Sequence, residues 1–119
     1  MTERAKIKGI VREDTRELER FQNEVLRPIL KTQHELLIQS FQAYLKQRKI
    51  DFSKLNHQTQ EKHINSILSK DTAYKNLQVG MIVGHFTLEE FTNYKEHSGE
   101  YNRRILQMLK KRLKDTLIS

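Results

Sequence analysis

Residues 77–86 read Leu77-Gln-Val-Gly-Met-Ile-Val-Gly-His-Phe86 and form the most continuously apolar run in an otherwise polar chain. Gly80 and Gly84 lie in this run, one helical turn apart. The run leads directly into Thr87-Leu-Glu-Glu90, a capping-box pattern that predicts the start of a new helix. We therefore expect residues 72–85 to form a central buried helix around which the other helices pack.

The two glycines allow two interpretations. Glycine in a helix interior costs about 1 kcal/mol relative to alanine, so Gly80 and Gly84 suggest that a bulky group lies against this helix. Close packing against a neighbouring helix explains the spacing, and a self-association face or a ligand near the backbone is the functional alternative. Helices in membranes use the same spacing, but a run of about ten residues is too short to span a bilayer.

The composition limits the class of protein. A length of 119 residues with one proline and four glycines favours one domain of long helices over a strand-and-turn architecture. The chain has no cysteine, which excludes disulfides, iron–sulfur clusters and thiol catalysis. The first residues lack the apolar segment of a secretory signal. We expect a cytoplasmic protein that does not bind a membrane.

Apolar residues at helical spacing predict an all-α fold with five or six helices in a bundle. Residues 1–13 are polar without a clear period, so we expect a mobile extension before a single helical domain over residues 14–119. Asp14 and Asp71 are the expected N-caps of two helices, and Phe52 is expected to hold the loop over residues 49–56. The helices are expected at about 15–26, 28–48, 55–69, 72–85, 88–97 and 100–117.

Pro28 is the only proline and interrupts the first apolar pattern. It has no N–H to donate to the carbonyl of Glu24, and its ring disfavours the α-helical region at Arg27. We therefore expect the helix to break or kink here, with Pro28 in the first turn of the next helix.

Three segments of the sequence resemble a family of short, all-helical proteins from Bacteroidota. They are Leu26-Arg-Pro-Ile-Leu30, Gly80-Met-Ile-Val-Gly-His-Phe-Thr-Leu-Glu-Glu-Phe91 and Asn102-Arg-Arg-Ile-Leu-Gln-Met-Leu-Lys-Lys-Arg-Leu113. The resemblance covers residues 26–113 and implies a helical fold, and some family members carry the label glyoxalase. Vicinal-oxygen-chelate glyoxalases are β-rich and hold their metal with strand-borne histidine and glutamate, a strand pattern that this sequence lacks.

The five histidines are the candidate metal ligands. His57 and Glu61 are four residues apart and could share a helix face, whereas a predicted helix break separates His85 from Glu89. Zinc normally takes three or four protein ligands, and neither His-Glu-x-x-His nor Glu-x-x-His occurs. No nucleophile elbow or glycine-rich phosphate loop is present either. We therefore expect no metal and no cofactor, and we assign no catalytic residue.

The last helix carries most of the net charge of +7, because residues 101–119 contain six basic residues and one acidic residue. At about 100° per residue, three of the basic residues lie opposite the apolar stripe and two flank them. This pattern predicts a basic face, which either binds nucleic acid or another polyanion or is simply solvated. The residues of this face are Arg103, Arg104, Lys110, Lys111 and Lys114.

Arg112 differs from these residues because it projects close to the direction of the apolar Ile105. An arginine in this position needs an acidic partner or a route to water. Two interpretations remain open: the side chain extends to solvent near the helix end, or it is a charge-paired pocket arginine. We also expect the apolar stripe of this helix to pack against the stripe of the helix over residues 28–48.

Three functions of different classes fit these observations. The first is a small, non-catalytic helical binding or interaction module, which forms a homodimer or binds a protein partner. The second is a weak nucleic-acid or polyanion binder that uses the basic face of the C-terminal helix. The third is an enzyme of the kind that the glyoxalase label implies. The lack of a recognition-helix motif favours the first over the second, and a deep pocket with convergent polar groups would favour an enzyme.

Overall fold

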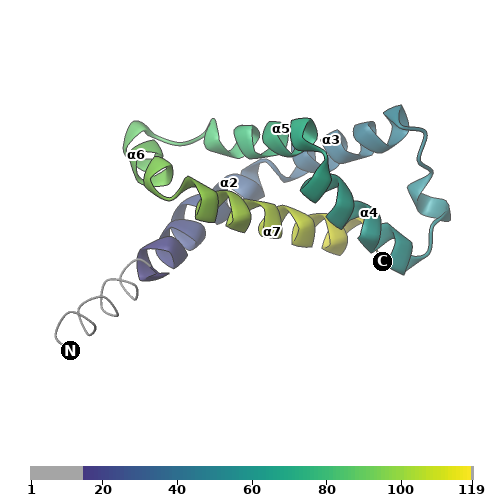
Figure 1. The fold of residues 1–119 in the computed structure, drawn as a ribbon, viewed down its shortest axis with the longest axis horizontal. Helices are drawn as coiled ribbons and strands as arrows, with labels where there is room; N and C mark the ends of the chain where they lie inside the picture. The colour runs from purple at the N-terminus through teal and green to yellow at the C-terminus, as the bar shows by residue number, and fades with distance from the viewer. Residues whose placement is uncertain (1–14, 119) are drawn as a thin grey trace.

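The computed structural model describes residues 15–118, and this part of the chain is an all-α bundle without β-strands (Figure 1). The predicted fold class is therefore confirmed. The expected extension over residues 1–13 and the expected N-cap Asp14 lie outside the described residues. After helical turns over residues 15–21, the elements are the π-helix η1 (Gln22–Leu26), α2 (Arg27–Thr32), α3 (His34–Gln47), the 3₁₀ helix η2 (Phe52–Lys54), α4 (His57–Lys70), α5 (Thr72–Val83), α6 (Leu88–Glu96) and α7 (Ser98–Leu117).

The first helical stretch passes through Pro28, so of the two expected outcomes, a break or a kink, the break does not occur, while Pro28 lies in the first turn of α2 as expected. Residues 15–32 are continuously helical, and Arg27 keeps α-helical angles of φ −59° and ψ −47°. The reason is η1, in which the Arg27 N–H donates to the Gln22 carbonyl five residues earlier. This wider turn accommodates both the missing donor and the bulk of the ring. The break lies instead at Gln33, with φ −89° and ψ 4°, so two helices replace the one expected over residues 28–48.

The starts of three helices are stabilised by the side chains of their N-cap residues. Asp71 and Thr87 cap α5 and α6 as predicted, and Asn56 caps α4; each side chain accepts an N–H from the first turn. Thr87 also forms a full capping box with Glu90, whose carboxylate accepts the Thr87 N–H at 2.8 Å. The break before α7 lies at His97, directly before residues 98–99, which were expected to separate the last two helices.

The helix α7 lies beside α4, α5, α6 and η1, and it crosses the middle of the view in Figure 1. Its fully buried side chains recur every four residues and are at most 4% exposed: Tyr101, Ile105, Leu109 and Leu113. We expected the stripe of α7 to pack against the segment 28–48, but this contact is only part of the packing around α7. Leu37 and Leu113 line one small apolar space between α3 and α7, but the backbone of α7 runs closest to that of α4.

The position of α5 differs from the central one expected for residues 72–85. The buried side chains of α5 form a single stripe at four-residue spacing, namely Tyr74, Gln78 and Ile82. On another side of the same helix, Leu77 is 56% exposed. Continuous apolar character therefore does not place α5 at the centre, because its neighbours cover only one of its sides.

The glycines of α5 lie on its uncovered side. Gly80 and Gly84 are both exposed, and a Cβ atom placed on Gly80 would meet no neighbouring group of the described chain within 4 Å. A Cβ atom on Gly84 would lie 3.1 Å from the Gly80 carbonyl oxygen of the same helix. The prediction that these glycines pack against a neighbouring helix is therefore wrong.

Replacing Gly80 with alanine should stabilise the protein by about 0.5–1 kcal/mol, because alanine restricts the unfolded chain and meets no obstacle in the folded one. Urea denaturation of Gly80→Ala and the unchanged protein measures the difference. Gly84→Ala is the matched control and should gain less, since its new methyl group crowds the Gly80 carbonyl. A loss of stability in Gly80→Ala would show that another group covers this side of α5.

Asp71 connects the end of α3 to the start of α5. Its Oδ2 accepts a hydrogen bond from the Tyr44 hydroxyl at 2.6 Å and one from Arg48 at 3.1 Å, while Oδ1 accepts the Tyr74 N–H. The bond from Tyr44, and after it the one from the Tyr74 N–H, holds the pKa of Asp71 below its ordinary value of 3.8. The resulting stability is present above that ordinary pKa and is lost as the pH falls through the lower pKa of the folded state.

Tyr44→Phe should therefore destabilise the protein at neutral pH, and the difference in melting temperature should shrink as the pH falls below 3.8. Thermal melting followed by circular dichroism between about pH 7 and pH 2 measures this profile. Tyr94→Phe is the control, because the Tyr94 hydroxyl donates to the uncharged Asn102 side chain. If both variants show the same dependence on pH, Asp71 is not the group that titrates.

Candidate functional site

Two of the basic residues predicted for the last helix reach α4. The Lys110 ammonium donates to Ser69 Oγ at 2.9 Å, and the Lys114 ammonium lies 3.3 Å from Glu61. The Lys114 side chain is 29% exposed. Both lysines lie at the surface, as expected of the solvated face, but each also contacts α4, which packs along α7.

The other three residues of the predicted basic face separate from these lysines. Arg103 is exposed and pairs with Glu100 in the first turn of α7. Arg104 and Lys111 lie on a different side of α7, where they line a groove. The structure therefore brings two of the five predicted residues together, and it adds Arg112 to them.

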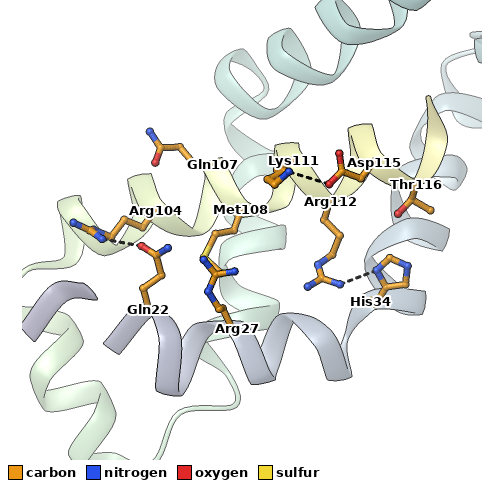
Figure 2. Close-up of a pocket in the computed structure, with 10 residues that line it drawn as sticks. All are labelled: Gln22, Arg27, His34, Arg104, Gln107, Met108, Lys111, Arg112, Asp115 and Thr116. Carbon is orange, nitrogen blue, oxygen red and sulfur yellow. Dashed lines mark hydrogen bonds and ion pairs between the residues drawn. The ribbon is translucent and has the colours of Figure 1, made fainter. Parts of the chain in front are cut away.

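A groove of about 450 Å³ lies between α7 and residues 22–34 (Figure 2). Figure 2 shows the side chains of the two segments extending toward each other across this space. Residues 22–34 contribute Gln22, Arg27 and His34. The helix α7 contributes Arg104, Gln107, Met108, Lys111, Arg112, Asp115 and Thr116.

The aromatic ring of Phe21 holds the N-terminal segment in place along α7. Its centroid lies 4.4 Å from that of Tyr101 and 5.5 Å from that of Phe86, and its side chain is 4% exposed. Gln22 follows directly, and Arg27 comes after the π turn. The buried Phe21 ring therefore determines which residues of this segment face α7.

Arg104 and Gln22 bridge the two segments at one end of the groove. The Arg104 Nη1 donates to Gln22 Oε1 at 2.7 Å, and its Nε donates to Glu100 at 3.3 Å. The Arg104 side chain is 18% exposed. This end of the groove therefore has a fixed, partly buried guanidinium group.

Arg112 and His34 bridge the segments farther along α7. The Arg112 Nη1 lies 3.1 Å from His34 Nδ1. A guanidinium group has donors only, so Arg112 is the donor of this bond and His34 Nδ1 the acceptor. Arg112 is thus a pocket arginine, but its partner is a histidine and no carboxylate of the described chain pairs with it.

Arg27 lies between these two bridges, beneath Met108 in Figure 2. Its Nε donates to Asn23 at 2.8 Å, one turn earlier in the same segment. No carboxylate within residues 15–118 pairs with Arg27. Lys111 is different, because its ammonium lies 3.1 Å from Asp115.

The balance of charge in the groove is strongly positive. Three arginines and one lysine line it together with a single carboxylate, which Lys111 already binds. Guanidinium groups pair with carboxylates and phosphates through two parallel hydrogen bonds. The arrangement can therefore hold an anion between two segments that are distant in the sequence.

Sequence reasoning missed Gln22, Arg27 and His34, because nothing in their local pattern indicates that they face the last helix. Part of the signal was present on α7 itself. Arg104, Met108 and Arg112 are spaced by four residues and share one side of a helix. The interpretation centred on Arg103, Lys110 and Lys114 overlooked this row.

The candidate metal ligands remain apart from one another. No three histidine, cysteine, aspartate or glutamate side chains gather at a common point within residues 15–118. His57 and His85 are exposed, and Glu90 takes part in the capping box of α6.

Treatment with EDTA should leave the melting temperature unchanged, since metal binding normally needs at least three converging protein ligands. Differential scanning calorimetry before and after dialysis against the chelator measures this. A clear drop, accompanied by stoichiometric zinc in elemental analysis, would show that a metal site exists.

Comparison with family models, with curated proteins and with solved structures finds no match to this chain. The resemblance to the helical Bacteroidota family therefore stays a prediction. Within the described chain, no helix combines the length and apolar character that crossing a membrane requires.

Proposed function

We propose that this protein is a non-catalytic helical binding module that holds an anionic ligand in the groove between α7 and residues 22–34. The observation that carries this proposal is the pair of guanidinium groups of Arg27 and Arg112, which face one groove without a carboxylate partner in the described chain. A positive charge that lacks a protein counter-charge is available to a ligand.

The size of the groove supports a small ligand or a short segment of a larger one. Its volume of about 450 Å³ lies within the roughly 300–1,000 Å³ that is typical of small-molecule sites. Met108 provides an apolar surface, and Gln107 and Thr116 provide uncharged polar groups. This combination of a few polar anchors with an apolar wall is common in ligand sites.

A nucleic-acid binder that uses a continuous basic face on α7 is less well supported. Lys110 and Lys114 contact α4, and no phenylalanine, tyrosine or tryptophan side chain lines the groove for stacking on bases. The homodimer remains a prediction, for which the exposed Leu36 and Leu77 are candidate contact residues. The cysteine-free composition supports a cytoplasmic location.

Isothermal titration calorimetry with citrate and with pyrophosphate, at constant ionic strength, tests the proposal. Arg27→Gln and Arg112→Gln should each weaken binding by about tenfold or more, because each removes a charge-assisted hydrogen bond of roughly 1.5–3 kcal/mol. Arg103→Gln is the matched control: it removes the same charge outside the groove, from the same helix as Arg112, and should leave affinity unchanged.

Three equal effects would show that net charge alone attracts the anions, and the proposed site would be wrong. Circular dichroism of each variant checks that the helices are intact. Because Arg27 and Arg103 are both exposed, neither change should disturb the core.

A further inference from the structure

The three guanidinium groups of the groove form a row. Arg104 and Arg112 are eight residues apart on one helix, which corresponds to about 12 Å along its axis at 1.5 Å per residue. Figure 2 shows Arg27 entering from the opposite segment between these two positions. The positive charges therefore follow the length of the groove.

Most donors of this row have no protein partner in the described chain. A guanidinium group has five N–H donors. Arg27 uses one of them on Asn23, and Arg112 uses one on His34. Arg104 uses two, on Glu100 and Gln22. Each arginine thus has at least three donors without a partner in the described chain.

We propose that the ligand is a linear oligophosphate, held with one phosphate near Arg104, another near Arg112 and an intervening one near Arg27. This inference rests on the proposed function and names the class of anion. A phosphate chain carries negative charge at every unit, which matches a row of cations in a narrow groove. A polycarboxylate of the same length would place uncharged methylene groups between its charges.

The same chemistry is present in free polyphosphate and in the phosphate tail of a nucleotide. Either presents phosphate oxygens to the arginines, and the guanidinium groups bind these oxygens and not the rest of the ligand. A nucleic-acid strand is a different ligand, because sugars separate its phosphates and its bases stack best on phenylalanine, tyrosine or tryptophan, none of which lines the groove.

Calorimetric titration with orthophosphate, pyrophosphate, tripolyphosphate and a longer polyphosphate, at constant ionic strength, tests the inference. Affinity should rise at least tenfold from orthophosphate to the chain that first spans the row, and then level off. Arg104→Gln and Arg112→Gln remove the two ends of the row, and each should abolish most of this gain. Arg27→Gln provides a third variant at an exposed position, in case the partly buried Arg104 is needed for folding.

The control variant Arg103→Gln should keep the full dependence on chain length. A titration with ATP separates the two sources: affinity equal to that of tripolyphosphate indicates that the phosphate chain alone is bound, and tighter binding indicates a nucleotide. Both results support the inference.

Other outcomes would overturn it. If citrate, orthophosphate and the longer polyphosphate bind equally and all depend on Arg27 and Arg112, the anion site stands and the oligophosphate inference fails. If no anion depends on these arginines, the proposed function fails as well. Displacement of tripolyphosphate by a single-stranded oligonucleotide at lower concentration would replace the inference with nucleic-acid binding.

Discussion

Burial of the apolar stripe of α7 is the constraint on which the rest of the structure depends. Tyr101, Ile105, Leu109 and Leu113 are almost completely removed from solvent, and each such side chain contributes roughly 1.5–3 kcal/mol through its burial. The four positions are spread along a helix of 20 residues. The stripe therefore gathers α4, α5, α6 and η1 around α7, with α3 completing the cover near Leu113.

The groove follows from the same constraint. Phe21 packs on Tyr101 at the start of the stripe, so the chain after Phe21 must run along α7. The π turn carries the helix through Pro28 without a break and keeps Arg27 directed toward α7. Arginines that are far apart in the sequence are thereby brought to one space. A site made from two segments in this way depends on the core for its geometry.

Local patterns predicted the helices well, but for some helices they predicted that the wrong side is buried. The N-caps Asp71 and Thr87 were predicted because a capping side chain acts on the N–H groups of its own first turn. Gly80 and Gly84 were placed in the core because their surroundings in the sequence are apolar, yet both are exposed. Arg112 was recognised as unusual from its angular position on α7, while its partner His34 had no local signal.

The sequence by itself determined the all-α class, most helix boundaries and the concentration of positive charge on α7, because these depend on interactions within a few residues or on composition. The tertiary structure alone decided that α7 and not α5 gathers its neighbours, that Lys110 and Lys114 reach α4, and that Arg27 meets α7 across a groove. The physical reason is that an amphipathic helix specifies which of its sides is buried, but not which helix will bury it.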